Sequence, residues 1–177
     1  MLKKIAFIIM GIPVKGMLGK INEHLFKEKA KKYQMFYYKK MGIDISGIPR
    51  YISTDVYFGG YDYSKIHIGD RVTVSREVMF LTHDFSINNA FSAAPEISGG
   101  LKLLLKDIYI GNNSFIGARV SLLPGATVGK DCIIGAGSVV KGTIPDGSIV
   151  IGSPARVIGR TMDFANKHNE LKDFIRV

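Results

Sequence analysis

A six-residue pattern repeats through the middle of the sequence and limits the folds open to it. A bulky apolar residue returns at every sixth position, and a mostly small residue stands two positions before it. In residues 107–142 the bulky positions are Ile110, Ile116, Leu122, Val128, Ile134 and Val140, and those two before them are Ile108, Ser114, Val120, Ala126, Cys132 and Ser138. The same frame occurs upstream at Ile68, Val74 and Phe80, preceded by Ile66, Val72 and Val78. Every bulky position in both blocks is apolar, so the pattern is not a chance alignment.

The six-residue period has a direct structural meaning. Side chains two positions apart point to the same face of a short extended segment. A tight turn, eased by Gly, Asn or Asp, then redirects the chain. Three such faces close a triangular coil of about 18 residues, and coils stack at the strand spacing of ~4.8 Å with the bulky residues inside. The repeat therefore predicts a mainly β protein built on a parallel β-helix.

The frame is interrupted between residues 81 and 107, which predicts a loop that projects from the coil. A long loop without pattern in a compact domain is usually functional. After Val140 a turn precedes a restart of the frame at Ile149. We therefore predict a β-helix domain over residues 51–160 that contains the loop 81–107.

Both ends of the chain predict helices. Between Ile21 and Met41 apolar residues recur with helical spacing, and Gly42 provides a stop. Residues 161–177 predict a shorter C-terminal helix. Such helices can cover the open ends of a β-helix. We assign residues 1–50 to a basic, largely helical N-terminal segment.

The positive charge belongs to that N-terminal segment. The formal net charge is +9; residues 1–50 hold 11 Lys and Arg against three acidic residues, whereas residues 51–177 hold 13 against 12. Anionic lipids attract polybasic helices, which favours contact with a membrane surface. A solvated lysine face that caps the coil is the alternative. No RNA-binding motif surrounds the aromatic residues of this segment, so nucleic acid is not an expected partner.

The sequence contains no apolar run that reaches the roughly 20 residues of a membrane span. Pro13 and Lys15 interrupt the apolar stretch near the N-terminus, and no small-residue cleavage site follows. We therefore expect a cytoplasmic protein, which lies at the inner face of the membrane if the basic helix binds lipid.

The closing coils carry a resemblance to a known family. The run from Ile134 to Val140, followed by Gly152 to Ile158, resembles the hexapeptide-repeat acyltransferases, and within them the galactoside/maltose and capsule- or lipopolysaccharide-modifying sugar O-acetyltransferases. The resemblance implies that the β-helix is left-handed and that the chain forms a homotrimer with active sites between neighbouring coils. It also implies acetyl-CoA as the acyl donor and a carbohydrate hydroxyl as the acceptor.

His83 is the candidate catalytic residue. It stands where the coil frame ends and the loop begins, the place at which the resembled family carries its general base. A neutral imidazole, with an ordinary pKa near 6.5, can take a hydroxyl proton at neutral pH. The alternative is a histidine that only forms a hydrogen bond within the loop.

Two aspartates near His83 are candidates for binding the acceptor. Asp84 follows His83 directly, and because adjacent side chains of extended backbone point apart, a substrate or structural role is favoured over a His–Asp pair. Asp62 lies one coil earlier, near where related sugar acetyltransferases place acceptor-binding groups. A turn-capping aspartate is the equal alternative for Asp62.

The coenzyme positions come from the resemblance. The positions that match the family's contacts with the pantetheine arm are Ala118, Ala136 and Lys141. Arg156 and Arg160 are the matching candidates for the phosphates of coenzyme A, which suit guanidinium groups. The family often has a hydroxyl residue where this chain has Ala118 or Lys141.

Rival chemistries are weaker. Cys132, the sole cysteine, occupies a small inward position of the repeat and is expected to be a buried, unreactive thiol. His67 and His83 are the only coil histidines, so the histidine triad of a metal-dependent β-helix enzyme is incomplete and we expect no metal. Two other functions stay open: acyl transfer to an amine of an amino acid or nucleotide sugar, and a non-catalytic or metal-dependent coil protein.

Overall fold

The computed structural model describes residues 20–94 and 100–175, and it divides the chain into two units, residues 1–41 and 42–177. The apolar stretch around Pro13 lies outside the described residues. In the first unit the structure describes one helix, α2 (Lys20–Met41), close to the predicted range. No helix of the described ranges is long and apolar enough to cross a membrane.

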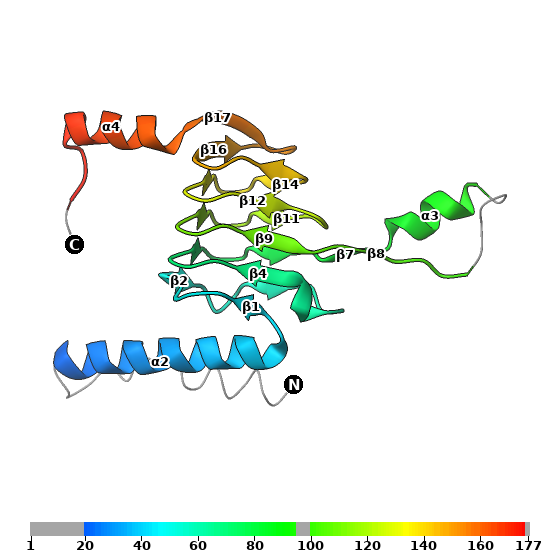
Figure 1. The fold of residues 1–177 in the computed structure, drawn as a ribbon, viewed down its shortest axis with the longest axis horizontal. Coiled ribbons are helices and arrows are strands. Elements are labelled where there is room, and N and C mark those ends of the chain that lie inside the picture. Colours follow the sequence, from blue (N-terminus) through cyan, green and yellow to red (C-terminus); the bar gives the residue numbers. More distant parts are fainter. Residues whose placement is uncertain (1–19, 95–99, 176–177) are drawn as a thin grey trace. The chain divides into compact units, whose positions relative to one another are not determined.

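The second unit is a three-sided parallel β-helix (Figure 1). Sheet A contains β1 (Asp44–Ile45), β4 (Ile66–Ile68), β9 (Ile108–Ile110), β12 (Thr127–Val128) and β15 (Thr143–Ile144). Sheet B contains β2 (Tyr51–Ile52), β5 (Thr73–Val74), β10 (Phe115–Ile116), β13 (Ile133–Ile134), β16 (Ser148–Ile151) and β17 (Arg156–Arg160). Sheet C contains β3 (Tyr57–Phe58), β6 (Met79–Phe80), β11 (Ser121–Leu122) and β14 (Val139–Val140). The predicted β-helix class is confirmed.

The apolar frame forms the interior column of the coil. All nine bulky positions of the repeat are buried, with no more than 3% of any side chain exposed. Phe115 pairs with Ile133, and Ser121 pairs with Val139, so successive coils are offset by 18 residues, the length that three six-residue faces predict. The period in the sequence is therefore the period of the coil.

The small inward positions do more than leave space. The hydroxyl of Ser114 donates to the Gly129 carbonyl at 2.8 Å and accepts from the Cys132 amide at 3.0 Å. The hydroxyl of Ser138 donates to the Gly135 carbonyl at 2.7 Å and accepts from the Gly152 amide at 3.2 Å. Because buried polar groups need partners, these serines tie one coil to the next at its corners.

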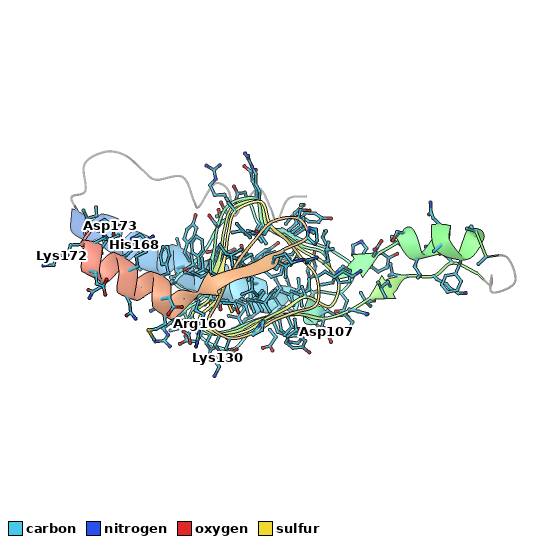
Figure 2. The ribbon with its side chains drawn as sticks, turned by 90° about the horizontal axis from the view of Figure 1, so that it is seen from above. Asp107, Lys130, Arg160, His168, Lys172 and Asp173 are labelled. Carbon is cyan, nitrogen blue, oxygen red and sulfur yellow. The ribbon has the colours of Figure 1, made fainter. Side chains whose placement is uncertain are left out.

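The excursion from the coil is more ordered than its sequence indicates. It begins with β7 (His83–Asp84), continues through α3 (Ser86–Ser92) and returns through β8 (Leu104–Leu105), which pairs antiparallel with β7. We call this segment the arm; it projects from the side of the coil in Figure 1 and, seen from above, in Figure 2. Two-residue strands are too short to show periodicity, so the sequence predicts only a loop.

The C-terminal end closes the coil by a hairpin. After β16 the chain reverses, and β17 pairs antiparallel with it, Ile151 opposite Arg156 and Ser148 opposite Arg160. Helix α4 (Thr161–Leu171) follows. The stretch from Gly152 to Ile158, which the sequence treats as part of the closing coils, thus covers the last edge of sheet B and ends the parallel stack.

Replacing Gly111 tests how tightly the coils stack. A Cβ at this position would lie 2.5 Å from the carbonyl carbon of Gly129, a backbone atom of the next coil, whereas a Cβ at Gly159 meets nothing within 4 Å. Gly111→Ala should therefore lower the free energy of unfolding by about 1–3 kcal/mol, and Gly159→Ala should change it by less than about 0.5 kcal/mol. Urea denaturation followed by circular dichroism measures both. Equal midpoints for the two variants would contradict this packing.

Candidate active site

Thr82 fixes the point at which the arm leaves the coil. Its side chain is fully buried, and its hydroxyl donates to the Gly59 carbonyl of the coil below at 3.4 Å. Its own carbonyl accepts from the Lys106 amide at 2.9 Å, where the arm returns. Because Thr82 is held on both sides, the next residue, His83, has a defined position at the corner between sheets C and A. Sequence reasoning did not single out Thr82, whose role depends on contacts with Gly59 and Lys106.

His83 is half-buried at the base of the arm. It pairs with Leu105 in the two-stranded ribbon. Its ring lies 5.3 Å from the ring of Tyr61 and 5.9 Å from the ring of Phe85, measured between centroids. Its Nδ1 atom is buried and has no hydrogen-bond partner among the described residues. A neutral imidazole carries its proton on one of two nitrogens, so the tautomer of His83 depends on what binds beside it.

Asp84 bonds forward along the chain. Its Oδ1 atom accepts from the Ser86 amide at 2.8 Å, at the start of α3. The bonds from Ser86 lower the pKa of the Asp84 carboxyl, and the charges of His83 and Lys141 lower it further. Asp84 is therefore a carboxylate at neutral pH, held by the arm, with two predicted site residues in its electrostatic surroundings.

Asp62 caps a turn, which is one of the two roles that the sequence analysis gave it. It is the N-cap of a short 3-10 helix, η1 (Tyr63–Lys65), and its Oδ1 atom accepts from the amide and the hydroxyl of Ser64 at 3.0 and 2.6 Å. The Ser64 bonds lower the pKa of the Asp62 carboxyl. Asp62 thus shapes the turn that follows Tyr61, the aromatic neighbour of His83.

Three predicted coenzyme positions share the corner between sheets B and C. Ala118 is half-buried and Ala136 is exposed; the two lie on successive coils, because the amide of Gly137 donates to the Ala118 carbonyl at 2.8 Å. Arg156 lies opposite Ile151 in the closing hairpin, at the same end of sheet B. We call this the B–C corner; Ala118 and Ala136 present only small side chains there, and the side chain of Arg156 is exposed.

The other two predicted coenzyme residues lie elsewhere. Lys141 follows β14 at the C–A corner, the corner that carries His83, and its charge acts on Asp84. Arg160 is paired with Ser148 at the opposite end of β17 from Arg156, and Figure 2 shows it where the strand meets α4. The structure therefore does not bring the five predicted positions together on one corner.

Cys132 is unsuited to nucleophilic chemistry. Its side chain is buried, and its Sγ atom lies 3.1 Å from the Pro145 carbonyl. Burial raises the pKa of the thiol. Since only the thiolate is strongly nucleophilic, this cysteine fills the core, as its position in the repeat predicts.

His67 belongs to a separate cluster on sheet A. Its Nδ1 atom lies 3.0 Å from Oδ2 of Asp44, and its ring stacks on Tyr109 with centroids 4.3 Å apart. Within residues 20–94 and 100–175 no three His, Cys, Asp or Glu side chains gather into a group that could hold a metal ion. The neighbours of His67 are therefore packing and hydrogen-bonding partners and not further metal ligands.

Residues 107–142 match the family model described as bacterial transferase hexapeptide (six repeats). Protein CapG of Staphylococcus aureus is 35% identical over 138 residues, which are 78% of this chain and 77% of CapG. Galactoside O-acetyltransferase of Escherichia coli is 34% identical over 113 residues, 64% of this chain, and the match spans 52% of that enzyme's length.

A solved structure shares the fold. A galactoside acetyltransferase in complex with coenzyme A superposes with a TM-score of 0.57 at 22% identity, over 99% of this chain and 87% of the other. The match to CapG is extensive in both chains, and the family model falls on the coils that carry the repeat. The chain therefore belongs to the hexapeptide-repeat acetyltransferase family.

Proposed function

We propose that the protein is an acetyl-CoA-dependent O-acetyltransferase that acts on a sugar hydroxyl of a surface polysaccharide or its precursor. The observation that carries the proposal is the position of His83, a half-buried imidazole at the junction of coil and arm with exposed aromatic rings beside it. The relatives support the substrate classes, since one is a galactoside O-acetyltransferase and a related structure contains coenzyme A.

The proposed reaction is a direct transfer. One ring nitrogen of His83 takes the proton of the acceptor hydroxyl as its oxygen attacks the thioester carbonyl of acetyl-CoA. The tetrahedral intermediate collapses, the carbon–sulfur bond breaks, and the thiolate of coenzyme A takes the proton from His83. The products are the acetyl ester and free coenzyme A. The buried pair of contacts at Thr82 holds the imidazole in place during both proton transfers.

Coenzyme A would lie along the B–C corner. Ala118 and Ala136 present little side chain there, so the pantetheine arm can approach the backbone of two successive coils. We assign a phosphate to the exposed guanidinium group of Arg156 at this corner. Arg160, predicted for the same role, lies at the other end of β17 and is not assigned to the coenzyme. Lys141 acts electrostatically on Asp84, the residue after His83, and we assign Asp84 and Asp62 to the acceptor.

The two halves of this site occupy different corners of one chain, which argues for an oligomer, and we propose the homotrimer that the family resemblance implies. Sheet C separates the B–C corner from His83, and one six-residue side of the coil spans up to ~20 Å. A donor at the B–C corner therefore meets a His83 from a neighbouring chain. The outer face of sheet B supports such association: Tyr51 and Phe115 are 52% and 42% exposed, and Ile133 and Ile149 are half-buried beside them.

Replacing His83 tests the proposed chemistry. His83→Gln keeps a polar side chain of similar size but removes the base, so the rate of acetyl transfer should fall about 10²- to 10⁴-fold. His67→Gln is the matched control, because His67 contacts Asp44 and Tyr109 away from the arm. Release of free coenzyme A thiol, with methyl galactoside, glucoside and mannoside and an amino sugar as acceptors, measures the rate.

Two outcomes of that assay would refute the proposal. Full activity of His83→Gln would show that His83 is not the general base. Acetyl transfer to the amino sugar's amine alone would show that the product is an amide and not an ester.

We also infer that α2 places the protein at the anionic inner face of the membrane, beside a lipid-linked acceptor. Between residues 29 and 41 the helix carries five lysines and no acid. Lys29, Lys32, Phe36 and Lys40 recur at helical spacing and are all exposed, and the Lys40 ammonium lies 5.8 Å from the centre of the Phe36 ring. Cationic side chains around an exposed aromatic ring favour a lipid interface.

Vesicle flotation tests this placement. The full chain should float with phosphatidylglycerol vesicles at low salt and less at high salt, and it should not float with phosphatidylcholine. Lys29→Gln with Lys32→Gln should weaken binding about 30-fold, because each charge contributes about 1 kcal/mol near an anionic surface. Lys167→Gln with Lys172→Gln, on and just after α4, is the control. Absence of flotation, or equal loss in both variants, would contradict the role of α2.

A further inference from the structure

Three aromatic rings meet at the base of the arm. The ring of Tyr61 lies 5.3 Å from that of His83 and 5.9 Å from that of Phe85, and the rings of His83 and Phe85 are 5.9 Å apart. Tyr61 is 64% exposed and Phe85 is 40% exposed. We call Tyr61 and Phe85 the aromatic pair. Two exposed rings grouped around a candidate base form an apolar surface open to a ligand.

The coil geometry forces Tyr61 into this place. The Gly59 amide donates to the Phe80 carbonyl at 2.7 Å, and a Cβ on Gly59 would meet that carbonyl oxygen at 2.7 Å. Only glycine lets the lower coil come so close to the strand that leads to His83. Tyr61 follows two residues later, and Asp62 then fixes the turn by capping η1.

The arm determines the position of the second ring, that of Phe85. Asp84 accepts from the Ser86 amide, which holds the backbone on both sides of Phe85 as α3 begins. Phe85 comes from the arm and Tyr61 from the lower coil, so the two rings flank His83 from different elements. Neither ring is buried against the core, and their shared neighbour is the imidazole.

We propose that the aromatic pair is the surface that selects the acceptor, with the apolar face of a pyranose ring stacked on Tyr61 and bounded by Phe85. The C–H groups of one sugar face suit the electron-rich face of an aromatic ring. A sugar stacked there directs its edge hydroxyls towards His83, and the Asp84 carboxylate follows on the arm with the charge of Lys141 acting on it. This inference rests on the proposed sugar O-acetyltransferase function and names its acceptor-selecting residues.

Steady-state kinetics with each substrate varied in turn test the assignment. Tyr61→Ala and Phe85→Ala should each raise the KM for the methyl pyranoside acceptor about 10-fold, with the KM for acetyl-CoA unchanged. Tyr61→Phe should keep the low acceptor KM, since the ring rather than the hydroxyl does the stacking. Tyr109→Ala, which removes an exposed ring on sheet A, is the control, and thermal unfolding verifies that each variant folds. Unchanged acceptor KM values, or a rise in the KM for acetyl-CoA instead, would overturn the inference.

A binding experiment separates this inference from the proposed function. Saturation-transfer difference NMR uses the His83→Gln protein, methyl galactoside, methyl glucoside and methyl mannoside, and no acetyl-CoA. We expect magnetic saturation to pass from the protein to the C–H protons of one sugar face. This signal should be lost when Tyr61→Ala is combined with His83→Gln. Such stacking, together with a wild-type protein that transfers no acetyl group to any of these sugars, would refute the function and keep the site. Acetyl transfer with no effect of Tyr61→Ala on the acceptor would keep the function and refute the site.

Discussion

The stacking of 18-residue coils around one apolar column is the interaction on which the second unit and its candidate site depend. Each strand of the coil is only two to four residues long, so no strand would be stable alone. Hydrogen bonds between successive coils and the buried frame from Ile66 to Val150 hold them together. The serines at 114 and 138 close the corners by satisfying buried groups of the coil above. The residues of the candidate site lie at the corners of this coil and on the arm that leaves one of them.

The triangular coil places the candidate catalytic residue and the candidate coenzyme positions of one chain on different corners. His83 stands at the corner from which the arm leaves, whereas Ala118 and Ala136 lie at the preceding corner on successive coils. In the proposed function, the small residues that would hold the donor and the imidazole with its aromatic pair are two half-sites on different corners. The exposed rings of Tyr51 and Phe115 on sheet B give the faces by which chains would associate.

The repeat predicts the coil in detail because a six-residue period is a local property of the sequence. Three things depended on contacts between distant residues and stayed out of reach. The ribbon of the arm arises from pairing between His83 and Leu105, and the closing hairpin from pairing between Ile151 and Arg156. Tyr61 escaped notice for the same reason, since only coil stacking brings it against His83. Sequence reasoning placed His83 at the coil–arm junction because the frame visibly ends there, and it left two roles open for Asp62.

The central claim, an active site shared between the B–C corner of one chain and His83 of the next, is tested most directly by hybrid oligomers. One variant is His83→Gln, and the other is Ala118→Trp, which fills the B–C corner; each alone should be inactive. Co-refolded at equal amounts, the mixture should sediment at three times the 19.5 kDa chain mass and recover about a quarter of the wild-type activity, because one site in four then pairs two intact halves. A mixture that sediments as a trimer but stays inactive would contradict the shared site, and a folded, active monomer would contradict the assembly.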